Sequence, residues 1–189
     1  MTSIPFGAQS MTAPLNQVLV KAPGMAFGGG FNKPEFGFRH PVNLTTARRE
    51  HAGFVALLRK LGVTVHELVM ENNSPDFIYQ YDPALVTDRG AILLRSGKPN
   101  RRGEEDLQRK WFEKSGIPVI GRIEAPGTVD GGDVFWLRPD VVWVDGDPAV
   151  RRVAERATPE RSSGALPWLL GVEDQRPPWR SRQCRTGGA

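Results

Sequence analysis

The feature that most constrains the fold of this 189-residue chain is a repeated succession of short strands and amphipathic helices. In the first repeat, residues 17–21 (QVLVK) predict a strand, residues 45–62 a helix that Thr45 or Asn43 can cap, and residues 63–70 (VTVHELVM) a returning strand. The helix carries apolar residues at the spacing that places them on one face, namely Phe54, Leu57, Leu58 and Leu61. Helices that alternate with strands indicate an α/β fold.

The second repeat follows the same order. Residues 84–87 (ALVT) and 91–95 (AILLR) predict two strands joined by a hairpin turn that ends in glycine. A helix is expected within residues 102–116, because this segment has acidic residues in its first turn, basic residues in its last turn and a terminal glycine. Its apolar face would be Leu107, Trp111 and Phe112, and residues 118–123 (PVIGRI) predict the returning strand.

A third repeat opens with strands at 133–137 (DVFWL) and 141–144 (VVWV) and then loses the pattern. More than half of residues 146–189 are Arg, Pro, Gly or Ala, a composition with little from which to build a core. We interpret this tail as an out-of-frame translation that begins near Asp145, with a basic arm as the alternative. The expected organisation is a flexible N-terminus at 1–15, a partial α/β domain at 16–145 and a poorly ordered tail at 146–189.

The charge of the chain is distributed unevenly. Residues 1–145 hold 17 Lys and Arg against 16 Asp and Glu, so the net charge of +4 belongs mostly to the tail. We therefore expect no nucleic-acid partner, although a non-catalytic protein whose basic tail binds RNA or an acidic partner stays as an alternative. The lone Cys184 and the absence of a signal-like or membrane-spanning apolar run favour the cytoplasm and no membrane partner.

Charged side chains cluster at three places next to the predicted strands. Asp76 and Asp82 bracket an apolar segment, PDFIYQYD, that we expect to be a strand. Asp130 and Asp133 enclose a glycine pair (DGGD) that predicts a turn with positive φ. Each cluster alone is explained by turn formation or solvation.

The remaining cluster is GKPNRRGEE, with Arg101 and Arg102 before the second helix. Glu104 and Glu105 need no role beyond complementing the helix dipole. Carboxylates together with an arginine suit a ligand that has a cation at one end and a carboxylate at the other, such as arginine or a methylarginine. A guanidinium is planar and permanently charged, and it pairs with carboxylates through two parallel hydrogen bonds.

The motifs, taken in order, resemble those of the guanidino-group modifying enzymes, which include dimethylargininases, arginine deiminases and amidinotransferases. The resemblance covers about residues 18–144 and rests on PDFIYQYD, GKPNRRGEE and GTVDGGDVFWL. It implies an α/β propeller (a pentein) with five ββαβ-type units, of which this chain would contain about two and a half.

The resemblance also implies roles for individual residues. Asp76 and Asp82 would be the aspartates that bind the substrate guanidinium and anchor a loop, and Arg101, or its neighbour Arg102, would meet the substrate carboxylate. Asp130 would be the catalytic carboxylate, whereas Asp133 would hold the turn through backbone N–H groups. The glycine-rich residues 26–31 (AFGGGF) would form a lid. The absence of a GK[ST] motif after them weakens a phosphate-binding interpretation.

The chain departs from the family where the reaction needs a cysteine thiolate as nucleophile and a later histidine as proton donor. His40, His51 and His66 all precede the site motifs, and we assign them no catalytic role. Cys184 lies in RSRQCRTG, without the glycine-rich, histidine-bearing context expected of the nucleophile.

The function implied is that of an amidine hydrolase of the dimethylargininase type that lacks its Cys/His half and is inactive alone. An arginine deiminase or amidinotransferase relative is the alternative. The expected partner is a small guanidino substrate, no cofactor or metal is expected, and homo-oligomerisation is left open.

Overall fold

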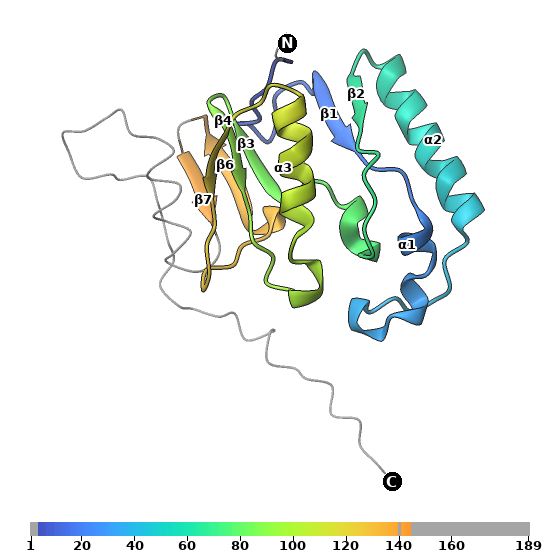
Figure 1. Ribbon diagram of the computed structural model, residues 1–189. Coiled ribbons are helices and arrows are strands. Elements are labelled where there is room, and N and C mark those ends of the chain that lie inside the picture. The colour runs from blue at the N-terminus through green and yellow to red at the C-terminus, as the bar shows by residue number, and fades with distance from the viewer. Residues whose placement is uncertain (1–3, 140, 145–189) are drawn as a thin grey trace, which may run out of the picture.

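The computed structural model describes residues 4–139 and 141–144, which form three small sheets with two principal helices (Figure 1). The expectations for residues 146–189, including Cys184, lie outside the described residues. Figure 1 shows the sheets following one another across the molecule, from β6–β7 through the middle sheet to β1–β2. The α/β fold and the strand–helix repeats predicted from the sequence are therefore confirmed.

The first unit contains two parallel strands joined by a long helix. Strand β1 (Gln17–Val20) pairs with β2 (Thr64–Glu67), and α2 (Leu44–Lys60) connects them along the outer side of the molecule. The Asn43 side chain accepts a hydrogen bond from the Thr46 N–H, which decides the helix cap in favour of Asn43.

The predicted inward face of α2 is only partly correct. Leu58 is buried, and so is Val55, which lies on the same side of the helix. Phe54, Leu57 and Leu61 are exposed instead. The spacing identified the helix, but a two-stranded sheet offers too little surface to cover an apolar stripe of this width.

The middle unit is buried on both faces of its sheet. Strands β3 (Ala84–Thr87) and β4 (Gly90–Leu93) form the predicted hairpin, and β5 (Val119–Arg122) pairs with β4 in parallel. Helix α3 (Glu104–Lys114) supplies Phe112 to a core on one face, where Leu93 and Ile117 also lie. The core on the opposite face extends to the third sheet and comprises Leu85, Ile92, Leu94, Ile123, Val129, Val134 and Trp136.

The third unit consists of the antiparallel strands β6 (Val134–Arg138) and β7 (Val141–Val144), as the sequence predicts. The N-terminal segment contacts both the middle and the third unit through Gln9. The Gln9 side chain accepts a hydrogen bond from the Asp88 N–H at 2.8 Å and donates one to the Pro139 carbonyl at 2.9 Å. The division of the chain at residues 15 and 145 stays a prediction.

One local expectation is wrong. The segment between Asp76 and Asp82 is not a strand, because it begins with the 3₁₀ helix η3 (Pro75–Ile78). Proline suits the first turn of a helix, and the buried Phe77 ring holds this turn against the core. The glycine-rich loop that follows β1 also forms short helical turns, α1 (Met25–Gly28), η1 (Gly30–Asn32) and η2 (Pro34–Phe36). Helix α1 packs against η3.

Among the residues that the structure describes, no helix is long and apolar enough to cross a membrane.

Candidate functional site

Lys21, a buried lysine that directly follows β1, contacts the η3 turn that carries Asp76. The Lys21 ammonium donates hydrogen bonds to the Met70 carbonyl at 2.6 Å and to Glu71 at 3.0 Å. It also lies 5.4 Å from the centre of the Phe77 ring, within the range of a cation–π contact. Because Lys21 is buried, these contacts connect the first unit firmly to the η3 turn.

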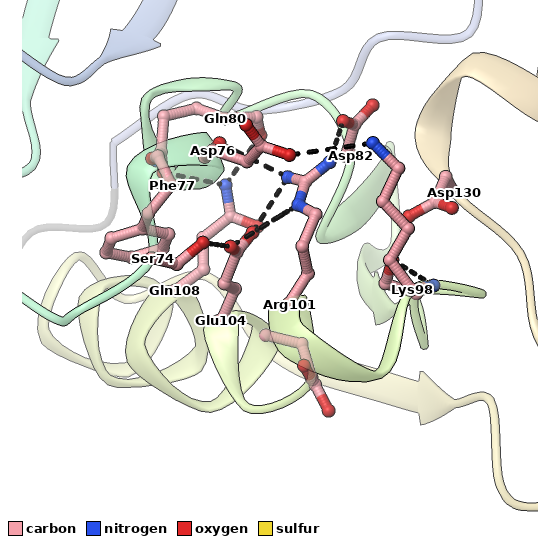
Figure 2. A network of polar contacts seen from close by, with 12 residues as sticks. Ser74, Asp76, Phe77, Gln80, Asp82, Lys98, Arg101, Glu104, Gln108 and Asp130 are labelled. Atoms are coloured by element: carbon pink, nitrogen blue, oxygen red, sulfur yellow. Dashed lines mark hydrogen bonds and ion pairs between the residues drawn. The ribbon is translucent and has the colours of Figure 1, made fainter. Parts of the chain in front are cut away.

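Arg101 lies at the centre of a buried network of carboxylates (Figure 2). It ends the 3₁₀ helix η4 (Pro99–Arg101), and its side chain is only 4% exposed. One guanidinium nitrogen, Nη1, donates to Asp82 at 2.6 Å, while Nε and Nη2 donate to Glu104 at 3.1 and 2.8 Å. Nη2 also reaches the Asp76 carbonyl at 3.3 Å. Arg101 therefore holds the segments that carry the two predicted aspartates in one place.

The electrostatics of this network follow from its burial. Burial alone would lower the pKa of Arg101, but hydrogen bonds and charges from Glu104 and Asp82 outweigh it, so that the pKa is raised. Burial raises the pKa of Glu104 above its usual value, and the hydrogen bonds from Arg101 and Ser74 partly offset this shift. A buried arginine that bridges two carboxylates stays charged and fixes their positions.

Glu104 was assigned only to the helix dipole, and this interpretation is incomplete. Glu104 is 3% exposed, and its carboxylate accepts hydrogen bonds from the Arg101 guanidinium and the Ser74 hydroxyl. The signal that could have identified it is the spacing of three residues between Arg101 and Glu104, which allows an ion pair across one helical turn. Glu105 is also buried and pairs with Arg122 at 3.0 Å.

Asp130 comes from a different unit, at the start of the 3₁₀ turn η5 (Gly131–Asp133). The Asp133 carboxylate accepts a hydrogen bond from the Asp130 N–H at 3.2 Å, which confirms that Asp133 holds the turn. One Asp130 oxygen, Oδ2, accepts a long hydrogen bond from Gly97 at 3.4 Å. In the described part of the chain, the other oxygen, Oδ1, is buried and has no hydrogen-bond partner.

The glycines of the DGGD motif have another purpose than the expected positive φ. Neither Gly131 nor Gly132 has a positive φ. A Cβ atom on Gly131 would lie 2.1 Å from the Tyr81 carbonyl oxygen, so only glycine fits there. The Gly131 N–H donates to the Asp82 carbonyl at 3.1 Å. This close approach brings Asp130 to the segment that ends at Asp82.

The four predicted site residues thus come together from three separate segments. Asp82, Arg101 and Asp130 line one small cavity of about 10 Å³, which is room for about one water molecule. Asp76 joins them through its carbonyl contact with Arg101 and through an ion pair with Lys98 at 3.5 Å. Lys98 was not singled out in the sequence, where it reads as an ordinary residue of a Gly-Lys-Pro turn.

A larger hollow of about 530 Å³ lies beside the network. The predicted lid, residues 26–31, does not line it, but the segment directly after contributes Lys33, Glu35 and Phe36, and the start of α3 contributes Glu104 and Leu107. Arg102 lines this hollow and is exposed, with a 3.5 Å hydrogen bond to the Ser96 carbonyl. Arg101 and Glu104 line both the hollow and the small cavity, so the two spaces adjoin.

His66 and His51 lie on elements that do not line the small cavity or the hollow. His66 on β2 shares a 2.9 Å hydrogen bond with Gln17 and meets the Trp111 ring edge to face at 5.7 Å. His51 lies within α2. These positions agree with giving neither residue a catalytic role.

Comparisons with known proteins identify the same group as the motifs. The chain is 28% identical over 120 residues to N(G),N(G)-dimethylarginine dimethylaminohydrolase of Pseudomonas aeruginosa, a match that covers 64% of this chain and 46% of that protein. The crystal structure of the P. aeruginosa enzyme with citrulline superposes with a TM-score of 0.66 at 23% identity, over 85% of this chain and 62% of the other. In sequence the chain is thus similar to a dimethylarginine dimethylaminohydrolase, and in fold it matches the same enzyme.

A second solved structure has a similar fold. The N-terminal domain of ArgZ, a cyanobacterial arginine dihydrolase, superposes on this chain with a TM-score of 0.64 at 17% identity, over 76% of this chain and 54% of that domain. Structural likeness at these identities establishes the fold alone. No family model matches the chain. The chain spans about half the length of the curated relatives it matches.

Proposed function

We propose that this chain carries the guanidinium-binding half of an amidine hydrolase site of the dimethylargininase type. The observation that carries the proposal is that Asp82 and Asp130 line one small cavity, while the Asp76 carbonyl contacts Arg101 of the same cavity. The carboxylates of Asp76, Asp82, Glu104 and Asp130 outnumber the cations Arg101 and Lys98, and this excess of negative charge favours a cationic ligand.

Each carboxylate has a distinct part in the proposal. Asp130 is the catalytic carboxylate, and its unpartnered Oδ1 supplies an acceptor for a guanidinium N–H. Asp76 and Asp82 are substrate-binding residues, with Asp82 already oriented by Arg101. Preoriented acceptors matter because a guanidinium pairs with carboxylates in a planar, two-pronged geometry.

The carboxylate end of an amino-acid substrate would meet Arg101 or Arg102. Arg101 already uses Nε, Nη1 and Nη2 in its contacts with protein oxygens. Arg102 is exposed and lines the 530 Å³ hollow, which is large enough for the body of an amino acid. The choice between them is decided by the binding experiment below.

Catalysis needs groups that we do not assign in this chain. In the family reaction, a cysteine thiolate attacks the guanidinium carbon and a C–N bond breaks as the leaving amine takes a proton. Water then releases citrulline from the covalent intermediate. Because no residue here is assigned as nucleophile or proton donor, we expect the chain alone to bind guanidino compounds without turning them over. The proposed binding domain is residues 16–145.

Isothermal titration calorimetry of the 189-residue chain with dimethylarginine, L-arginine and L-citrulline tests the proposal. The two cationic amino acids should bind and the neutral citrulline should bind more weakly. Asp130→Asn should weaken binding of the cationic ligands by roughly ten- to 150-fold, because a hydrogen bond to a charged group contributes about 1.5–3 kcal/mol. A matched control is Asp88→Asn, in the hairpin turn between β3 and β4.

The same titration assigns the carboxylate contact. If Arg102 contacts the substrate carboxylate, Arg102→Met should weaken the binding of L-arginine. It should not weaken the binding of methylguanidine, which lacks a carboxylate. An unchanged affinity for L-arginine would assign the contact to Arg101. Equal binding of citrulline and arginine, or release of citrulline from arginine by this chain, would contradict the proposed function. Dimethylarginine and arginine are both included because the relatives named above differ in substrate.

A further inference from the structure

Lys98 stands out in the candidate site as a cation that is weakly held. Its ammonium lies 3.5 Å from Asp76, whose side chain is only 8% exposed, whereas the Lys98 side chain is 61% exposed. Figure 2 shows the Lys98 side chain between Arg101 and Asp130, with a dashed line that marks its ion pair with Asp76. The ammonium is therefore paired with one carboxylate of the candidate site, that of Asp76.

The backbone of Lys98 is anchored although its side chain is free to leave. The Lys98 N–H donates to the Ser96 hydroxyl at 3.1 Å, and its carbonyl accepts from the Arg101 N–H at 3.0 Å. These bonds aim the side chain at the carboxylates. The exposed stem can swing into solvent, because lysine has a flexible four-carbon chain and an exposed ion pair contributes little stability.

Arg101 cannot behave in this way. It is 4% exposed and pairs with Asp82 and Glu104 at once, so its removal would leave buried charges without a partner. Of these two cations, only Lys98 can make way for a ligand. The exposure of the two side chains supports the same conclusion, since Lys98 is 61% exposed and Arg101 only 4%.

We propose that Lys98 is a resident cation of the carboxylate cluster, which a ligand cation must displace from Asp76 in order to bind. The inference rests on the proposed function for the identity of that ligand, a guanidinium. It makes Lys98 a specificity-determining residue. Monocations that pair with two carboxylates at once replace the ammonium, whereas neutral ligands have no such competition.

Calorimetry with methylguanidinium chloride as the probe tests the displacement. Lys98→Met keeps the aliphatic stem and removes the charge, and it should bind methylguanidinium roughly two- to fivefold more tightly than the natural chain. Lys98→Arg keeps a competing cation and should show no gain. Lys110→Met, at an exposed lysine of α3, changes the net charge equally and should have no effect. Citrulline affinity should not rise in Lys98→Met.

Nuclear magnetic resonance of the reductively ¹³C-methylated chain tests the resident ion pair without any ligand. The Lys98 signal, assigned by its loss in Lys98→Arg, should move in Asp76→Asn and stay in place in Asp88→Asn. A Lys98 signal that ignores Asp76→Asn overturns the inference whatever the calorimetry shows.

The two experiments separate the inference from the function on which it rests. If the natural chain binds methylguanidinium and Lys98→Met binds it no more tightly, the inference is overturned and the proposed function stands. If neither chain binds methylguanidinium while the Lys98 signal follows Asp76→Asn, the proposed function fails and the resident ion pair is supported.

Discussion

The first and the middle unit use the same kinds of elements but bury them to different extents. All four residues of β4 are buried, whereas all four residues of β1 are only partly buried. Phe112 of α3 is 3% exposed, while Phe54 of α2 is 52% exposed. The middle sheet has α3 on one face and the third sheet on the other, but β1 and β2 form a two-stranded sheet by themselves. Burial therefore depends on how many neighbours a unit has.

The polar contacts follow the same division. The middle unit contains the buried pair between Arg101 and Glu104, and the first unit has an exposed pair between Arg59 and Glu67 at 3.1 Å. Arg101 and Glu104 of the candidate site are thus more deeply buried than this pair of the first unit. The comparison predicts that changes in the middle unit will affect stability far more than matched changes in the first.

The largest contrast is expected between two phenylalanines. Phe112→Ala should lower the free energy of unfolding by about 3–5 kcal/mol, because it empties a buried position between α3 and the middle sheet. Phe54→Ala should lower it by less than about 1 kcal/mol, because most of that ring already meets solvent. Urea unfolding followed by circular dichroism measures both. Equal losses would contradict the division between the units.

A similar contrast is expected between two arginines. Arg101→Met should cost about 3–5 kcal/mol, because it leaves the buried Glu104 and Asp82 without their shared partner. Arg59→Met removes an exposed pair and should cost about 1 kcal/mol or less. The same urea transitions measure the difference. A cost for Arg101→Met as small as that for Arg59→Met would mean that the network does not stabilise the site.

Replacing either of two glycines by alanine should change the stability of the chain in opposite directions. Gly131→Ala should destabilise the chain by about 1–3 kcal/mol, because its Cβ would collide with the Tyr81 carbonyl. Gly53→Ala, within α2, meets no atom within 4 Å and should stabilise by about 0.5–1 kcal/mol, because alanine favours the helix. Thermal unfolding midpoints report both signs. A neutral Gly131→Ala would show that the turn relaxes easily.

The smallest effect concerns pH. Hydrogen bonding to Arg122 lowers the pKa of Asp106 below its usual value. A lowered pKa in the folded chain adds stability above the unfolded-state pKa, and this stability is lost as the pH falls through the folded-state value. Asp106→Asn should therefore cost less than about 1 kcal/mol at neutral pH, and this cost should vanish in acid. A double-mutant cycle with Arg122→Met isolates the pair. A cost that persists unchanged in acid would contradict the assignment.

Elements that depend on a few neighbouring residues were predictable from the sequence. The spacing of apolar residues in α2, the charges at the ends of α3 and the glycine turn between β3 and β4 all act locally. The motifs containing Asp76, Asp82, Arg101 and Asp130 also indicated which residues to examine. These patterns were sufficient for the α/β class, but they did not identify Glu104 and Lys98 as members of the candidate site.

Contacts between distant segments decided the rest. The turn at Pro75–Ile78 forms where Phe77 enters the core. Because α3 begins beside that turn, Glu104 accepts hydrogen bonds from Arg101 and Ser74. Phe54 is exposed because, among the described residues, no element covers that part of α2. Local sequence specifies which residues can share a face, but burial and ion pairing are properties of the surfaces that meet, and those surfaces exist only in the folded chain.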